Sequence, residues 1–218
     1  LVEVKGNIAT ATVSTNAEAA IKGNGNIKTP GAVNVQATGT ATADAGVATP
    51  KITLSGIDIA VNVISATLNA VQKSYIENTT VQSGSIRVIS TLNIANNTGA
   101  VAQMGSSADG VDANVSLIGA QVHSATATAN NLNHAFISGS NITTGGAVTV
   151  QSLARSYANA VIDESAINVG LITIGVTVLM ADASGDFKAY IDTTGANIYA
   201  ASILVDNTYT SRANAQTT

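Results

Sequence analysis

The chain has 218 residues; charged residues make up 10% of it and aromatic residues 3%, whereas apolar residues reach 45%. The formal net charge is −4, and Lys and Arg are scattered singly, which argues against a basic surface that binds nucleic acid. There is no cysteine, and the longest apolar run, residues 170–181, is too short to span a bilayer as a helix. A core of Ala, Val and Ile favours stacked strands over a large globular interior.

The first residues already have a strand-like pattern, and no signal peptide is recognisable. One pattern then recurs along the chain. A small or aromatic residue followed by Ile returns at steps of 55, 61 and 54 residues. The Ile residues of these pairs are Ile21, Ile76, Ile137 and Ile191. We therefore expect one β-solenoid over residues 1–218. It would contain a partial repeat 1–20, repeats 21–75, 76–136 and 137–190, and a partial repeat 191–218. Because both ends fall within a repeat, we expect a longer parent chain.

A second set of positions follows each pair, as two small residues, a branched residue, any residue and then Val. The branched positions are Val33, Ile86, Val148 and Ile203. A third set lies twenty residues before the pairs, with Leu1, Leu117 and Leu171, and Gly56 at the equivalent place. Such recurrence predicts that each copy stacks in register on the previous one and hides the branched side chains.

Between these positions the local period is two, which is the pattern of strands with one buried face. We expect the alternating apolar residues to be the buried ones; they are Val33/Val35, Ile52/Leu54, Ile59/Val61/Val63, Val148/Val150 and Ile172/Ile174/Val176/Val178. The longer middle repeat has its extra residues between Asn96 and Asn114, and the turn-rich stretch 103–112 predicts a loop.

These patterns together predict an all-β chain, a right-handed parallel β-helix with a repeat of about 55 residues and coils of about 18–28 residues. Two coils of about 27 residues per repeat are slightly favoured over three of about 18. The segment would then hold about eight to twelve coils and be about 40–60 Å long. Asn-rich corners are expected to adopt left-handed backbone conformations and to stack their amides, at Asn24, Asn26, Asn96 and Asn97.

No residues are expected to bind a metal or cofactor or to catalyse a reaction. His123 and His134 are two isolated histidines without cysteine, a weak basis for a zinc site. Asp109 and Asp112 flank a glycine turn but lack a calcium-binding pattern. The remaining carboxylates considered for polysaccharide cleavage are sparse and fall mostly at predicted turns: Asp163, Glu164, Asp182, Asp186 and Asp192.

Tyr75, Phe136 and Tyr190 share one position of the repeat. A structural role in the core or at a corner is the favoured interpretation. The alternative is an aromatic strip that contacts glycans.

Three stretches carry a resemblance to a known family: Ala189-Tyr190-Ile191-Asp192, residues 145–150 (GGAVTV) and residues 168–176 (NVGLITIGV). In these stretches the chain resembles the repeat regions of bacterial filamentous adhesins, the leukotoxin-like and haemagglutinin-like large surface proteins. The resemblance implies an extracellular or cell-surface location and a role in adhesion, and supplies no catalytic residues. We thus expect a stiff structural and adhesive fibre segment, not an enzyme, whose partners are host-surface or matrix glycans or like fibres. A lateral glycan- or self-binding module and a polysaccharide-active β-helix are the alternatives.

Overall fold

A computed structural model describes residues 2–47, 54–94, 106–111, 114–163, 168–169 and 171–217. These residues form strands joined by short turns, with no helix among them, and so none that could span a membrane. The strands belong to three parallel sheets. The front sheet holds β1 (Val2–Lys22), β5 (Leu54–Glu77), β9 (Asn114–Ser138), β12 (Asn168–Val169) and β13 (Ile172–Asp192).

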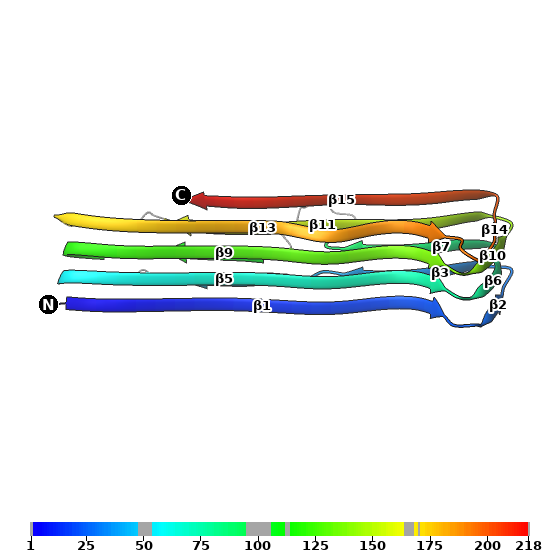
Figure 1. Cartoon of the computed structure of the whole chain (residues 1–218), viewed down its shortest axis with the longest axis horizontal. Coiled ribbons are helices and arrows are strands. Elements are labelled where there is room, and N and C mark those ends of the chain that lie inside the picture. The colour runs from blue at the N-terminus through cyan, green and yellow to red at the C-terminus, as the bar shows by residue number, and fades with distance from the viewer. Residues whose placement is uncertain are drawn as a thin grey trace.

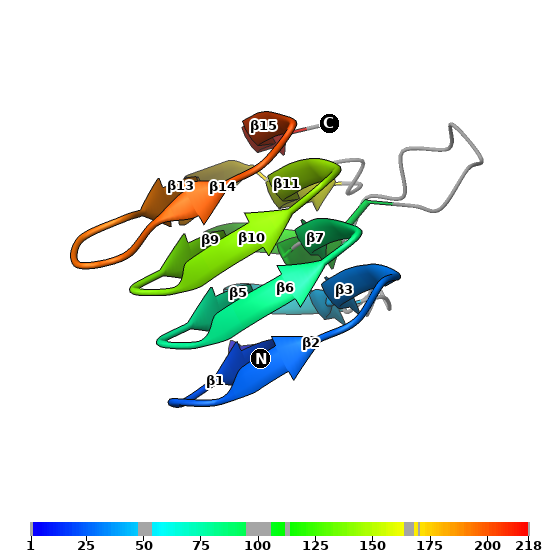
Figure 2. The ribbon, with the colours of Figure 1, turned by 90° about the vertical axis from the view of Figure 1, so that its right-hand side faces the viewer.

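The other two sheets complete each coil. A narrow corner sheet holds β2 (Asn26–Lys28), β6 (Thr80–Ser83), β10 (Asn141–Thr144) and β14 (Ile198–Tyr199). The back sheet holds β3 (Ala32–Gly39), β4 (Ala43–Val47), β7 (Ser85–Leu92), β8 (Ser106–Val111), β11 (Ala147–Asp163) and β15 (Ser202–Thr217). The chain runs along the front sheet, turns through the corner sheet, returns along the back sheet and rises by one strand (Figures 1 and 2). This winding is right-handed, so the predicted fold class, a right-handed parallel β-solenoid, is confirmed.

Strand register confirms the repeat positions found in the sequence. Ile21 pairs with Ile76, Ile76 with Ile137 and Ile137 with Ile191. In the back sheet, Val33, Ile86, Val148 and Ile203 likewise form one column across four strands. The first three of these side chains are buried and Ile203 is 52% exposed, because no further described strand covers the last coil.

The predicted coil length is wrong. Each repeat of about 55 residues makes one coil, since Ile21 lies directly beside Ile76 and not two or three strands away. The segment therefore has four coils and rises by about 20 Å at about 4.8 Å per strand, instead of the expected 40–60 Å. Its length lies across the axis: the 24 residues of β5 extend about 80 Å.

Small side chains allow the front and back sheets to pack closely along this length. One core cluster is built largely of alanines, among them Ala66, Ala127 and Ala160, and a second is built of Ile and Val next to the corner sheet. Between the sheets, the buried Asn133 side chain joins β9 to both β7 and β11. Its Nδ2 donates to Ser90 O (3.1 Å), Ser152 Oγ (2.9 Å) and Leu153 O (3.0 Å), and its Oδ1 accepts from Ser90 Oγ (2.6 Å).

The prediction of a loop over residues 103–112 needs correction. Ser106–Val111, expected to be a loop, forms β8, which pairs with β4 and β11; residues 103–105 and 112 lie outside the described residues. The middle repeat gains its length between Leu92 and Ser106, which pair with Ala154 and Ala158 of the next coil, and this range overlaps the predicted one between Asn96 and Asn114.

The corner asparagines were also assigned wrongly. Among the described residues, the non-glycine residues with positive φ are Asn78 (51°) and Asn93 (55°), and not Asn24 or Asn26. Asn96 and Asn97 lie outside the described residues. Asn78 occupies the register position of Gly139 (φ 56°), where the chain leaves the front sheet and glycine or asparagine tolerates the left-handed conformation.

Candidate functional site

The outer side of the front sheet carries a group of mostly aliphatic side chains near the amino-terminal ends of its strands. Strand register places these residues side by side in four columns. We call this surface the apolar face; it consists of Val2, Val4, Gly6, Ile8, Ile57, Ile59, Val61, Val63, Ile118, Ala120, Val122, Ser124, Ile172, Ile174, Val176 and Val178. Even in the inner strand β5, Ile57 and Val61 are 38% and 37% exposed.

The apolar face corrects a prediction about which side chains are buried. Ile59, Val61 and Val63, and likewise Ile172 to Val178 in β13, were expected to point into the core. Ile76 is fully buried, and side chains of a continuous strand alternate, so the even-numbered residues of β5 point inward and the odd-numbered residues outward. The branched side chains near the start of β5 therefore face outward. Ile52 lies outside the described residues.

The inward side of the same strand segments is polar. Asp58 is fully buried and receives Lys5 Nζ at 3.2 Å, and its Oδ1 has no hydrogen-bond partner among the described residues. Next to it, Asn7 donates to Asn62 (2.8 Å), whose Nδ2 lies 3.2 Å from His123 Nδ1. At this end of the coils the usual polarity of a half-buried sheet is thus reversed, with polar groups inside and aliphatic groups outside.

Tyr75, Phe136 and Tyr190 stack on the same outer side, near the corner sheet. The ring centroids of Tyr75 and Phe136 are 4.7 Å apart and those of Phe136 and Tyr190 5.0 Å, with interplanar angles of 3° and 2°. Both faces of the Phe136 ring and one face of each tyrosine ring, on which a sugar would stack, are therefore covered by a neighbouring ring, whereas Tyr190 at the end of the ladder remains 37% exposed. The ladder lies on the outer side of the sheet, apart from the core clusters, although Tyr75 is only 8% exposed. Its geometry supports the structural role.

A polar group surrounds the Tyr75 end of the ladder. Tyr75 donates its hydroxyl proton to Glu18 Oε1 (2.6 Å), and Lys22 Nζ donates to Glu18 (2.9 Å) and to the Tyr75 hydroxyl (3.2 Å). The hydrogen bond from Tyr75, with that from Lys22, lowers the pKa of Glu18, and the bond to Glu18 raises the pKa of Tyr75. These contacts tie the first coil to the second.

The two histidines do not form a shared site. His123 points inward and His134 outward, on opposite sides of β9. His134 Nε2 lies 2.9 Å from Asp186 Oδ2, and burial is the main effect that lowers the pKa of His134. No group of three His, Cys, Asp or Glu side chains that could hold a metal ion occurs in the described part of the chain.

The carboxylates considered for catalysis do not converge either. Asp182, Asp186 and Asp192 follow one another along β13, four and six residues apart, which separates them by about 13 and 20 Å. Paired glycosidase carboxylates lie about 5–9.5 Å apart. Asp186 binds His134 and Lys188, and Asp192 accepts from Thr194 N. Nothing is described of the side chains of the remaining candidates, Asp109, Asp112, Asp163 and Glu164.

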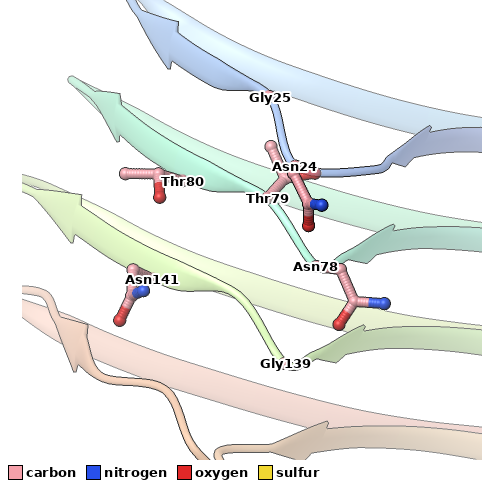
Figure 3. A pocket seen from close by; sticks show the side chains of 7 residues that line it. All are labelled: Asn24, Gly25, Asn78, Thr79, Thr80, Gly139 and Asn141. Atoms are coloured by element: carbon pink, nitrogen blue, oxygen red, sulfur yellow. The ribbon is translucent and has the colours of Figure 1, made fainter.

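A polar hollow of about 230 Å³ opens where the front sheet turns into the corner sheet (Figure 3). Amides, hydroxyls and glycine backbone line it, and no charged side chain does. The lining residues are Asn24, Gly25, Asn78, Thr79, Thr80, Gly139 and Asn141. Several of these groups already serve the turns: Thr79 Oγ1 donates to Gly23 O (2.8 Å), and Asn141 Oδ1 accepts from Asn197 N (3.1 Å). The hollow is thus a repeated corner whose polar groups hold adjacent coils together.

The apolar face is therefore the surface whose exposure internal packing does not explain, and sequence reasoning missed it. The signal lay in the numbering: Ile59, Val61 and Val63 are odd-numbered, whereas the anchor Ile76 is even-numbered. In one unbroken strand the two sets lie on opposite sides. Comparisons with protein families, curated proteins and solved structures found no match for this chain.

Proposed function

We propose that this chain is a structural and adhesive segment of an extracellular bacterial surface fibre, in which coils stack along one axis. The observation that carries the proposal is the in-register stacking of equivalent side chains through four coils, including the Ile21, Ile76, Ile137 and Ile191 column. Identical coils present the same edge at each level, so the same pairing can continue for as many repeats as a chain supplies.

The resemblance to filamentous adhesin repeats supports the location and the adhesive role. Composition agrees with a fibre, since a core of small and branched aliphatic residues needs neither disulfides nor large aromatic side chains. The proposal includes no enzymatic activity, because the described carboxylates of β13 lie too far apart for paired action.

Two measurements test this proposal. Small-angle scattering of the chain, and of a tandem protein that repeats residues 21–190, should give particles about 80 Å broad that lengthen by about 4.8 Å per added coil. Beads coated with the chain should adhere to host cells or matrix more than beads coated with an unrelated β-solenoid. A compact globule in scattering, or equal adhesion of both bead types, would contradict the proposal.

Lateral binding is the second candidate function, and the exposure of the apolar face favours it. For glycans, the closed stacking of Tyr75, Phe136 and Tyr190 leaves mainly ring edges for contact. A glycan array comparing the unmodified chain with Tyr75→Ala and Tyr190→Ala variants tests that form of the function. A blank array for the unmodified chain would count against it.

A further inference from the structure

The apolar face is a sheet surface that no other described strand covers. None of its positions is charged, and its inner-strand members Ile57, Ile59, Val61 and Val63 are each 37–38% exposed. In Figure 2 the outer side of β1, β5, β9 and β13 has no other described strand against it. Contiguous aliphatic surface of this kind marks an interaction site in a folded protein.

The reversed polarity of the strands strengthens this conclusion. At the same end of the coils the interior holds Lys5, Asp58, Asn62 and His123, so aliphatic burial inside the coil is replaced by polar contacts. Over this amino-terminal stretch the strands are amphipathic, yet their hydrophobic side points away from the coil. The surface therefore has the composition of one half of a β-sandwich core.

The composition of the face indicates its occupant. A glycan would need hydrogen-bond donors and free ring faces, and the face offers aliphatic side chains. An anionic membrane would need cations at the rim of the face. The outward lysines of the front sheet lie instead near the corner-sheet ends of the strands, close to acidic residues. These lysines are Lys22, Lys73 and Lys188, and the acidic residues are Glu18, Glu77 and Asp186. Evenly spaced columns of mostly branched side chains, with small residues at Gly6, Ala120 and Ser124, instead complement an identical surface, because two such faces interdigitate about 10 Å apart.

We propose that two copies of this chain pair through their apolar faces, front sheet against front sheet. Four strands about 4.8 Å apart and seven residues at about 3.3 Å each give a face of about 450 Å² per copy, or about 900 Å² for the pair. Specific interfaces begin at about 1,000–1,200 Å². Four coils therefore pair weakly, and each additional coil adds about 110 Å² per copy, so pairing tightens as the stack lengthens. Only this dependence on length rests on the proposed fibre function.

Sedimentation equilibrium from about 1 µM to about 1 mM tests the pairing. The unmodified chain should dimerise, and the double variant Val61→Lys/Val122→Lys should dimerise at least tenfold more weakly. The control Thr67→Lys/Thr128→Lys places the same charges on the same strands and outer side, six residues away, and should dimerise like the unmodified chain. All four substitutions lie in β5 and β9, which have neighbours on both sides, so their effect does not report pairing at the open edges of the stack.

Circular dichroism verifies that each variant is folded, and Val61→Thr/Val122→Thr, which keeps β-branched side chains, replaces the lysine variant if that unfolds. Spin labels on Ser124→Cys, in a chain without native cysteine, should give short distances between copies only in the dimer. A monomer at all concentrations, or equal dimerisation of both lysine variants, would overturn the pairing and leave the fibre proposal standing. If the chain stays monomeric but sediments with phosphatidylcholine or phosphatidylglycerol vesicles, and Val61→Lys/Val122→Lys abolishes this vesicle binding, the pairing proposal would be overturned in favour of a lipid surface.

Discussion

Asn133 offers the sharpest test of how the front and back sheets are held together. Replacing it with Leu, which has the same branching, removes four hydrogen bonds to β7 and β11. At about 1 kcal/mol each these total about 4 kcal/mol, and the buried Ser90 hydroxyl left without a partner costs a further 1–3 kcal/mol or so. Burial of the Leu side chain returns about 1.5–3 kcal/mol. We expect Asn133→Leu to lower the free energy of unfolding by about 2–5 kcal/mol.

Urea unfolding followed by circular dichroism measures this change. Asn130→Leu, on the exposed outer side of the same strand, is the matched control and should stay within about 0.5 kcal/mol of the unmodified chain. The double variant Asn133→Leu/Ser90→Ala should recover part of the loss, because it removes the stranded Ser90 hydroxyl, whereas Ser152 Oγ still donates to the backbone oxygen of residue 133. If Asn133→Leu is as stable as the control, the hydrogen bonds between the sheets are not what joins them.

Three further predictions concern the core, a corner and pH. Ile137→Ala, in the buried anchor column, should destabilise the chain by about 2–5 kcal/mol in urea unfolding, whereas Ile203→Ala in the exposed last coil should cost clearly less; equal losses would contradict the burial pattern. Asn78→Ala should cost about 1 kcal/mol because of its positive φ, and Asn78→Gly should be close to neutral, as thermal unfolding can establish. Burial lowers the pKa of His134 from 6.5, so its contribution to stability is complete above about pH 6.5 and is lost as pH falls through the lower folded value. The melting temperature should therefore fall more steeply between pH 7.5 and 5 in the unmodified chain than in His134→Gln, and parallel curves would refute this.

The stacking could be predicted because the period of a repeat identifies which residues are equivalent from one copy to the next. Ile21, Ile76 and Ile137 recur with the same neighbours, and equivalent residues of a solenoid pair in register. The period does not determine how many coils one repeat makes. Strands of 21 to 25 residues lie far outside the usual range, so an ordinary coil length was the natural and wrong expectation.

The side on which the apolar face lies could not be fixed from the sequence alone. Alternation in Ile59, Val61 and Val63 establishes a strand with two unlike sides, but local alternation does not state which side is covered. Counting from the anchor Ile76 along an unbroken strand fixes that side. That step requires knowing that no turn intervenes between Val63 and Ile76, and only the structure supplies this.

The long strands have a mechanical consequence for any stack of these coils. Each coil is about 80 Å broad, while its two facing sheets lie only about 10 Å apart, so the cross-section is long and thin, like that of a plank. Figure 1 shows the broad side and Figure 2 the end view. A plank bends readily through its thin direction and resists bending through its broad one. Filaments made this way would flex in a single plane, and micrographs would alternate between wide flat views and narrow edge-on views.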